Sequence, residues 1–152
     1  MYIRLGDYCE IQKGTPLTII NEYYQSIIII QGEYELIGNK LSSSDIFNRN
    51  GTYILIAPND IRIKHGKFYL TDFYISIEIT RPDIINYKYL FYLLKYKNIS
   101  NIKQLLELKL VRLTINNQLD YVDNLTNIEL KINNLQLEKN QILNLVQEYL
   151  IL

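Results

Sequence analysis

The sequence contains one cysteine, Cys9, and one histidine, His65. A lone cysteine cannot form an internal disulfide, and two candidate ligands far apart in the chain are too few for a zinc site. We therefore expect no disulfide framework and no bound metal, with Cys9 as a small core residue and His65 as a polar turn residue. A Cys–His nucleophilic pair would also need an orienting group, and nothing near either residue in the sequence supplies one.

Long apolar runs are missing as well. Apolar runs such as residues 27–30 are far shorter than the roughly 18 residues of a membrane span, so we expect no part of the chain to cross a membrane. No basic and apolar leader follows Met1, and together with the single cysteine this predicts a reducing, cytoplasmic location.

The six glycines are scattered, and none has the spacing of a P-loop or a dinucleotide fingerprint. The sequence therefore predicts no nucleotide cofactor. An Asn-Pro-Pro-Tyr-like motif, which a base methyltransferase would use, is missing too. Any methyl transfer is expected to belong to a partner.

What is present is ordinary for one folded domain. The chain has 152 residues, of which 48% are hydrophobic and 21% charged, which excludes a disordered or collagen-like protein. Within the apolar set, 26 Ile and 23 Leu stand against one Ala, and Asn occurs 16 times. This bias is typical of an AT-rich genome, so a single Ile or Asn carries less weight here than elsewhere.

The formal net charge is zero, but the charges are unevenly distributed. Residues 36–67 hold five basic and two acidic residues, and residues 86–112 hold six basic residues and one acidic residue, giving +3 and +5. Residues 113–152 hold two basic and five acidic residues, giving −3. The middle of the chain is therefore suited to phosphate, and the tail is not.

The first 80 residues read as strands joined by turns. Residues 53–57 form a short β-rich run that ends at Pro58, and residues 68–70 follow a predicted turn at His65–Gly66. Residues 74–80 alternate, with the three isoleucines on one face, which predicts a half-buried strand.

Helical spacing begins at Pro82–Asp83, which predicts a first helix over residues 82–97. A short helix around residues 102–106 and a strand-like segment over 108–113 follow. Asn116 and Asn117 are candidate N-caps of a last helix. No Gly or Pro occurs after them, so this helix is expected to continue to the C-terminus.

The last helix carries an apolar heptad seam interrupted by one lysine. The seam residues are Leu125, Ile128, Ile132, Leu135, Lys139, Ile142, Val146 and Tyr149. Four more leucines lie off this seam, at 130, 137, 143 and 150, which is too much apolar surface for one neighbour. The helix is also longer than a domain of this size needs, so we favour intermolecular contact over packing on its own domain.

The sequence also allows one enzymatic interpretation. Asp83, Glu107 and Lys109 imitate the arrangement in which carboxylates of a nuclease hold Mg²⁺ and a lysine assists the attacking water. The pattern is short, and Asp83 lies at a predicted helix start rather than at a strand end. We favour helix capping by Asp83 and solvated charges at Glu107 and Lys109.

Taken in order, the segments of the chain resemble one half of a type I restriction-modification specificity subunit. The opening with Leu5-Gly6-Asp7 is similar to the start of that family's target recognition domains, and residues 87–94 are similar to its aromatic–leucine helix. The order of the segments is more specific than any one of them. The similar segments are residues 3–14, 32–39, 50–57, 65–72 and 87–94, followed by a terminal helix after Gln118 that resembles the family's spacer helix.

The resemblance implies an α+β fold, with a small mixed-sheet target recognition domain over residues 1–115 and one long coiled-coil-type helix over residues 116–152. It implies a non-catalytic subunit that needs no cofactor, reads double-stranded DNA, and recruits adenine methyltransferase subunits and, through them, restriction subunits. Full-length members carry two recognition domains and two antiparallel spacer helices, whereas this chain carries one of each. We therefore expect a half-subunit that forms a homodimer through the seam.

In such a domain, Lys and Arg would position the DNA backbone while amide and hydroxyl groups read base edges in the major groove. The candidates are Lys13, Asn39, Lys40, Ser42, Ser43, Arg49, Arg62, Lys64 and Lys67. Each has an alternative as an ordinary solvated loop residue. The +5 segment from residue 86 would serve either the methyltransferase interface or phosphates.

Two other function classes stay open. A pure oligomerisation or scaffold protein would keep the long helix but would show no salt-dependent affinity for DNA. A small Mg²⁺-dependent nuclease would lose its activity on Glu107→Ala.

Overall fold

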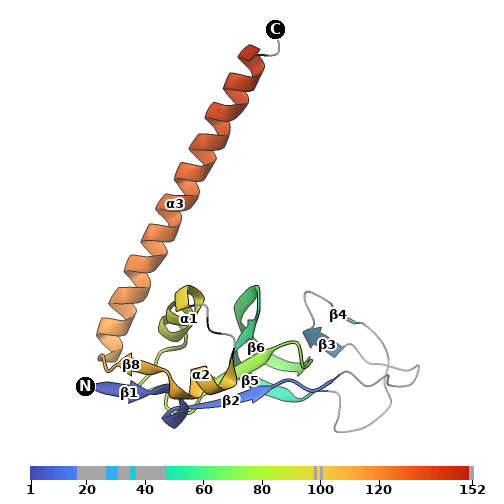
Figure 1. Ribbon diagram of the computed structural model, residues 1–152, viewed down its shortest axis with the longest axis vertical. Coiled ribbons are helices and arrows are strands. Elements are labelled where there is room, and N and C mark those ends of the chain that lie inside the picture. Colours follow the sequence, from blue (N-terminus) through green and yellow to red (C-terminus); the bar gives the residue numbers. More distant parts are fainter. Residues whose placement is uncertain (17–26, 31–34, 37–46, 98, 100, 151–152) are drawn as a thin grey trace.

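The computed structural model describes residues 1–16, 27–30, 35–36, 47–97, 99 and 101–150. The fold is α+β, as the sequence predicts, and its last helix rises from one end of the domain (Figure 1). In chain order the elements are β1 (Tyr2–Arg4), a 3-10 turn η1 (Leu5–Asp7), β2 (Cys9–Lys13), β3 (Ile27–Ile30), β4 (Glu35–Leu36), β5 (Arg49–Ala57), β6 (Asp60–Leu70), β7 (Ile75–Ile79), α1 (Tyr87–Lys97), α2 (Ile102–Glu107), β8 (Lys109–Val111) and α3 (Ile115–Leu150).

Six strands form the main sheet, in the order β2-β7-β5-β6-β3-β4. The described pairs are antiparallel except that β3 runs parallel to β6. Strands β1 and β8 form a separate antiparallel pair, which joins the N-terminal segment to the residues that precede α3. The sheet is therefore mixed, as predicted.

Strands β5 and β6 form one long hairpin that turns at Pro58–Asn59, where the sequence predicts a break. The second turn predicted at His65–Gly66 is wrong, because β6 continues through both residues and pairs with β5 along its whole length. Gly66 lies opposite Gly51, and both have positive φ, +100° and +148°. Glycine adopts this backbone at no steric cost, so the pair distorts the strands without ending them.

The sheet curls until the ends of β2 and β6 meet. The N–H of Thr15, just after β2, donates to the carbonyl of Leu70 at the end of β6 (2.9 Å). The Asn48 side chain pairs with the backbone of Leu70 at the same place, as a neighbouring strand would. Its Oδ1 accepts from the Leu70 N–H (2.6 Å) and its Nδ2 donates to the Leu70 carbonyl (2.9 Å). The curl gives the sheet an inner face and an outer face.

Two apolar cores fill these faces. The outer core contains Ile54, Ile77 and Cys9 together with residues of α1 and α2, so Cys9 is the small core residue that the sequence predicts. The inner core contains Leu55, Phe68 and other side chains within the curl. Ser76 was expected on a solvent face, but the curl buries it to 2% exposure.

Helix α1 begins at Tyr87, so the predicted start at Pro82–Asp83 is wrong. Asn86 caps the helix, since its Oδ1 accepts from the N–H groups of Lys88 (2.9 Å) and Tyr89 (3.2 Å). The Asp83 carboxylate instead binds the Arg81 guanidinium through two contacts of 2.8 and 2.9 Å. An acidic side chain that is already paired with a neighbouring guanidinium is not available as a cap.

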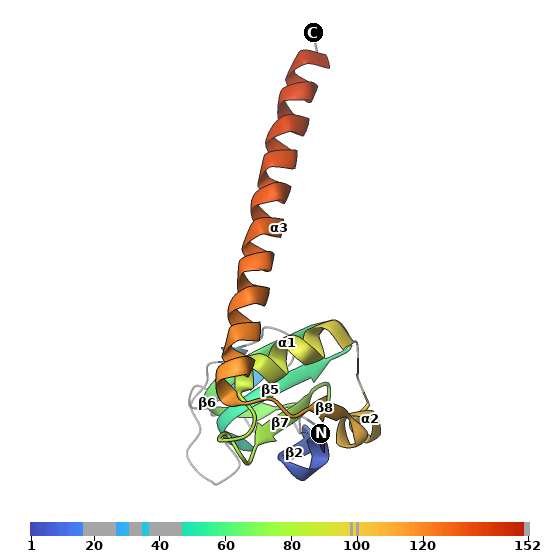
Figure 2. The same ribbon diagram turned by 90° about the vertical axis from the view of Figure 1, so that its left-hand side faces the viewer.

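Helix α3 begins at Ile115, because the Thr114 hydroxyl accepts from the N–H of Asn117 (3.2 Å) and so caps the first turn. The predicted caps Asn116 and Asn117 lie inside the helix. The base of α3 lies beside α1 (Figure 2) and is held by Gln118, whose side chain is only 2% exposed. Its Nε2 donates to the carbonyls of Ile84 (2.7 Å) and Leu113 (3.0 Å), and its Oε1 accepts from the N–H of Asn86 (2.8 Å).

Candidate functional site

The protruding part of α3 is the largest exposed apolar feature of the described residues. Every residue from 130 to 150 is exposed, and at 1.5 Å per residue this segment is about 31 Å long. Seam residues project from it, such as Leu135 (64% exposed) and Ile142 (61%), while Leu125 is half-buried at the base. The other seam positions Ile128, Ile132, Val146 and Tyr149 are exposed as well.

A second apolar stripe lies on the other side of the same helix. Leu130 and Leu137 follow Ile128 and Leu135 by two residues, which places them about 160° around the helix from the seam residues. Both leucines are exposed (56% and 61%). The protruding segment therefore presents two separate apolar stripes, one of them the predicted seam.

The base of α3 also contacts α1 through one acidic residue. Glu129 Oε1 accepts from Lys95 Nζ (2.7 Å) and from the Tyr96 hydroxyl (2.8 Å), while Oε2 accepts from the Tyr92 hydroxyl (3.3 Å). These donors lower the pKa of the Glu129 carboxyl, first through the Lys95 ammonium and then through Tyr96. Sequence reasoning missed this cluster, because Glu129 is more than 30 positions from each of its three partners in the chain.

Two of the predicted DNA-binding lysines lie three residues apart on β6. Lys64 is half-buried and Lys67 is exposed. His65, between them, is also exposed, and its Nδ1 lies 2.9 Å from the Thr52 hydroxyl. The Lys67 ammonium lies over the Phe47 ring at 5.1 Å. This part of the hairpin is basic and accessible, which is what a phosphate contact requires.

Arg62 lies near the turn of the same hairpin, in a network with its neighbours. Its Nε lies 3.2 Å from the Asp60 carboxylate, and its Nη2 donates to the Tyr74 hydroxyl (2.8 Å). That hydroxyl in turn donates to Asp60 (2.8 Å). The charge of Arg62 is thus partly balanced by Asp60, so Arg62 offers less to DNA than Lys64 or Lys67 does.

Arg49 is placed inside the curl rather than on the surface, with 7% exposure. Its Nε donates to the Ser76 hydroxyl (2.8 Å), Nη1 to the Asn48 carbonyl (2.8 Å) and Nη2 to the Lys13 carbonyl (3.2 Å). Burial lowers the pKa of the guanidinium. In this position Arg49 joins β5 to β2 and β7, and we leave it out of the surface that could meet DNA.

Five predicted DNA-binding residues remain, and the structure describes one of them. Lys13 is exposed at the end of β2. Asn39, Lys40, Ser42 and Ser43 lie outside the described residues.

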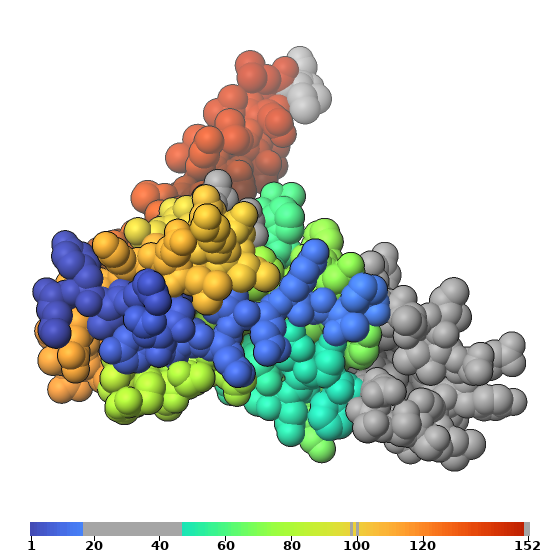
Figure 3. Space-filling model, turned by 60° about the horizontal axis from the view of Figure 1, so that its bottom comes forward, coloured from blue at the N-terminus to red at the C-terminus, as the bar shows by residue number. Residues whose placement is uncertain are grey.

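A basic groove that the sequence did not indicate lies at the other end of the domain. The pairing of β1 with β8 sets Arg4 opposite Lys109 and Tyr2 opposite Val111. A surface groove of about 470 Å³ lies here, and its lining includes Tyr2, Arg4, Asp7, Tyr8, Lys109 and Arg112. The space-filling view shows the N-terminal segment at this end of the molecule (Figure 3). Only the strand register brings Arg4 and Lys109 together, so no local sequence pattern could reveal the groove.

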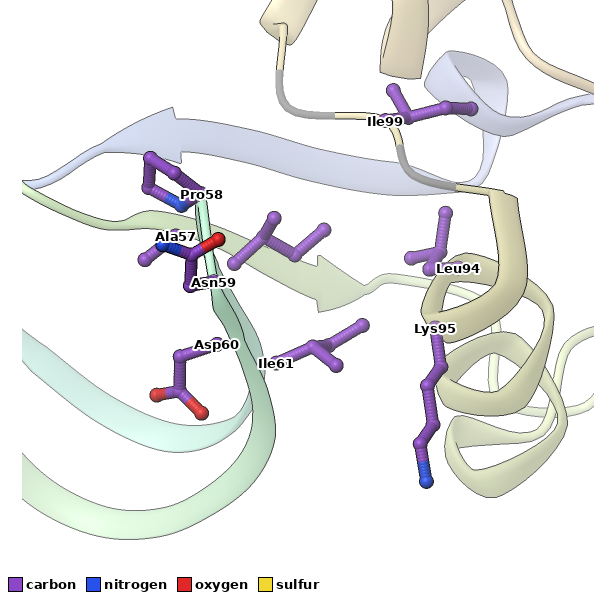
Figure 4. A pocket seen from close by; sticks show the side chains of 9 residues that line it. Ala57, Pro58, Asn59, Asp60, Ile61, Leu94, Lys95 and Ile99 are labelled. Atoms are coloured by element: carbon purple, nitrogen blue, oxygen red, sulfur yellow. The ribbon is translucent and has the colours of Figure 1, made fainter.

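A smaller groove of about 290 Å³ lies between the turn of the β5–β6 hairpin and the end of α1. Figure 4 shows Ile61 and Leu94 on its two sides, with the Asp60 carboxylate turned away from Lys95. The ammonium of Lys95 is already bound to Glu129. We assign no chemistry to this groove.

The nuclease interpretation finds no support in the geometry. Asp83 is paired with Arg81, and Glu107 and Lys109 lie at the end of α2 and in β8. Over the described ranges, no group of three or more His, Cys, Asp or Glu side chains could hold a metal ion. Burial raises the pKa of the Cys9 thiol to about 12, so at neutral pH this sulfur is a protonated core atom.

Among the residues that the structure describes, no helix has the length and the apolar character of a membrane span. The apolar stripes of α3 alternate with asparagine, glutamine and charged residues, so each stripe is narrow enough to pair with another helix.

Sequence comparison finds neither a matching family model nor a matching curated protein. Structure comparison finds several similar chains. One is the HsdS subunit from Thermoanaerobacter tengcongensis, with a TM-score of 0.62 at 16% identity over 88% of this chain and 38% of that chain. Another is the type I restriction-modification S subunit from M. genitalium, with a TM-score of 0.55 at 17% identity over 88% and 40%.

A third similar chain comes from a structure that describes complex assembly and conformational transition of the type I restriction-modification system. Its TM-score is 0.68 at 17% identity, over 89% of this chain and 39% of that chain. This chain thus spans less than half the length of the structures that it matches. At this level of identity the similarity concerns the fold, and each match covers 88–89% of this chain. The chain therefore has the fold of type I restriction-modification S subunits, over a length that corresponds to about two fifths of such a subunit.

Proposed function

We propose that this chain is a non-catalytic DNA-specificity half-subunit of a type I-like restriction-modification system. Residues 1–115 would read double-stranded DNA in the cytoplasm. Residues 116–152 would form a spacer helix that pairs with the same helix of a second copy and recruits an adenine methyltransferase subunit. The observation that carries the proposal is the arrangement itself, a domain with the fold of an S subunit followed by a helix whose last 21 described residues are all exposed.

Contact with DNA is supported by the accessible cations of the domain. Lys64 and Lys67 on β6 have no acidic partner within the salt-bridge distance among the described residues. Each phosphate that a lysine neutralises releases counterions from the duplex, so the affinity is expected to fall steeply with salt. A neutral chain can bind DNA in this way because its charges are unevenly distributed, with +3 over residues 36–67 and −3 over residues 113–152.

Pairing between two copies is supported by the seam. Burying a Leu or Ile side chain stabilises an association by about 1.5–3 kcal/mol before the entropic cost of association. Five seam residues from Ile132 to Tyr149 are about half exposed or more, which leaves that free energy available to a second helix. An identical helix offers the same stripe in return, as a twofold interface requires.

The second stripe supports a further partner. Leu130 and Leu137 stay exposed when the seam is covered, because they lie on the opposite side of the helix. A methyltransferase subunit that packed a helix there would be recruited without competing with the homodimer. The proposal thus uses both apolar stripes and leaves neither in solvent.

The first test measures the mass of the purified chain by light scattering and its affinity for duplex DNA over a salt series, with and without a candidate methyltransferase subunit. We expect a homodimer of about 36 kDa, twice 18.0 kDa, with a DNA affinity that rises on adding the methyltransferase and falls with salt. A monomer at micromolar concentration would contradict the homodimer. A dimer without salt-dependent affinity for DNA would favour the scaffold alternative.

A matched pair of variants tests the seam. Leu135→Glu with Ile142→Glu places two charges in the seam, and we expect the dimer to dissociate at least 100-fold more readily, because about 3 kcal/mol or more of apolar burial is lost. Asn133→Glu with Asn140→Glu adds the same charges at the same spacing outside both stripes. This control should remain a dimer in light scattering, and dissociation of both variants alike would show that net charge rather than the seam controls assembly.

A further inference from the structure

We infer that Glu129 is a positioning residue that sets the direction in which α3 leaves the domain, through its contacts with Lys95, Tyr92 and Tyr96 on α1. The inference goes beyond the proposed function, because it concerns how one half of the molecule is aimed relative to the other. Its relevance to DNA reading rests on the proposed function, but its test does not.

The first observation is where the contacts of α3 stop. At its base, α3 is held by the buried Gln118, by Val122 (6% exposed) and by the ring of Tyr121, which lies 6.2 Å from that of Tyr89. Among the described residues, Glu129 makes the last hydrogen bonds of α3 with the domain, and from residue 130 onward the helix is exposed all round.

The second observation is the geometry at Glu129. Three donors from successive turns of α1 converge on one carboxylate, and both of its oxygens are used. The Lys95 ammonium also lies 5.8 Å from the centroids of the Phe91, Tyr92 and Tyr96 rings, so its position is restricted before it meets the carboxylate. The side chains of Lys95 and Glu129 are 38% and 27% exposed. A single exposed ion pair stabilises little, but several converging donors define a direction.

The direction of a straight helix is fixed when the helix is attached at two separated points along its axis. Gln118 fixes the first point through three hydrogen bonds to backbone groups. Glu129 lies eleven residues further on, about 16 Å along the axis, and supplies the second point. Without Glu129, the described hydrogen bonds of α3 with the domain would end at Thr126, whose hydroxyl lies 3.2 Å from that of Tyr92, and the axis of α3 could swing about this shorter base.

A small swing would have a large effect at the far end. Asn144 lies 26 residues beyond Gln118, about 39 Å along the helix, so a rotation of 10° displaces it by about 7 Å. If a second copy docks on the seam, the direction of α3 fixes where the second recognition domain lies. The Glu129 contact would then determine which separation of two DNA half-sites the dimer accepts.

The test measures a distance within one chain. Spin labels are attached to cysteines introduced at Glu10, exposed in β2, and at Asn144, which is exposed and lies off the seam. The native Cys9 is buried and its thiol protonated, so the parent chain should take up almost no label. Labelled chains are diluted with unlabelled ones so that only intramolecular distances contribute to the dipolar electron resonance signal.

We expect one narrow distance distribution in the otherwise unchanged chain and a distribution broader by about 7 Å in Glu129→Ala, which corresponds to a swing of about 10°. Tyr96→Phe, which removes one hydroxyl, should broaden it less. The swapped pair Lys95→Glu with Glu129→Lys should narrow it again, because the ion pair is restored. Glu138→Ala removes an exposed glutamate of the same helix and should change nothing.

The variants are expected to fold, because alanine favours a helix at least as well as glutamate does and circular dichroism can verify the helix content. A distribution in Glu129→Ala with the parent width would overturn the inference and assign the direction of α3 to the apolar contacts at its base. Failure of the swapped pair to narrow the distribution would overturn it as well. Neither outcome involves DNA, so loss of the proposed function and loss of this inference are distinguishable.

Discussion

The curled-sheet domain buries apolar side chains in its two cores, whereas the protruding half of α3 exposes its own. Leu55 in the inner core is 0% exposed, whereas Leu135 on α3 is 64% exposed. Helix stability in proteins comes mostly from packing of an apolar face. The exposed leucines of this 36-residue helix contribute none of that packing within a single chain. The domain thus completes its own core, whereas the protruding half of α3 leaves apolar surface that no described residue covers.

The same contrast separates two cations of one sheet. Arg49 is buried and donates to three acceptors within the curl, whereas Lys64 lies on β6 with part of its side chain in solvent. Both residues belong to the same basic segment of the sequence. One of them holds strands together and the other is free to meet an anion, so the sum of charges in a segment overstates what its surface offers.

The largest expected effect comes from making the same substitution in both regions. Leu55→Ala should lower the free energy of unfolding by about 2–5 kcal/mol, because it leaves a cavity in the inner core. Leu135→Ala should change it by less than about 1 kcal/mol when urea unfolding is followed at the lowest usable protein concentration, where a partner helix contributes least. Equal losses in the two variants would mean that α3 is part of a core within a single chain.

The second comparison uses the two cations. Arg49→Ala should lower the free energy of unfolding by about 1–3 kcal/mol, because Ser76 and the Lys13 carbonyl lose their donor in a buried place. Lys64→Ala should leave stability within about 0.5 kcal/mol but weaken DNA binding and reduce the salt slope by about 1.

Lys131→Ala, on the protruding helix, is the control for that binding experiment. It removes the same charge from a residue that the proposal keeps away from DNA, so its salt slope should equal that of the unchanged chain. Equal slopes in Lys64→Ala and the unchanged chain would remove Lys64 from the DNA surface.

A dependence on pH is expected as well, and its effect at neutral pH is negligible. Burial raises the pKa of the Cys9 thiol from 9.0 to about 12, so the folded state binds this proton more tightly than the unfolded state. The resulting stability is fully present below pH 9 and is lost as the pH rises from 9 to 12. Urea unfolding over this window should show a steeper decline for the unchanged chain than for Cys9→Ala, which lacks the group.

A thiol reagent gives an independent measurement of the same burial. At pH 8 the folded chain should react very slowly with the reagent, and the chain in urea should react at once. Fast reaction of the folded chain would place Cys9 at the surface and contradict its assignment to the outer core.

Much of the fold follows from local patterns. The alternation over residues 74–80 predicts β7, the Pro58 break predicts the hairpin turn, and the period of three and four predicts α3 with its seam. These features depend on neighbours within a few positions. The predicted turn at Gly66 is wrong because pairing with β5 keeps that residue in a strand. The predicted helix start at Asp83 is wrong because its carboxylate binds the Arg81 guanidinium instead of capping a helix.

The candidate site could be predicted less well. Lys64 is half-buried and Lys67 is exposed on β6, whereas Arg49 is buried, and a basic residue looks alike in sequence whether the fold buries it or not. The groove with Arg4 and Lys109 depends on the β1–β8 register, and the Glu129 cluster depends on the packing of α1 against α3. Neither leaves a local pattern that a reader of the sequence could use.

The sequence by itself determined the alternation of β7, the helical period of α3 and an apolar seam too long for one small domain, because these depend on composition and spacing. Only the tertiary structure decided which polar residues are buried and how α3 is aimed. The curl of the sheet places Arg49 and Ser76 inside, while Gln118 attaches the helix to the residues before α1 and Glu129 attaches it to α1 itself. The physical reason is that burial and direction arise from contacts between segments far apart in the chain, whose effects no stretch of sequence contains.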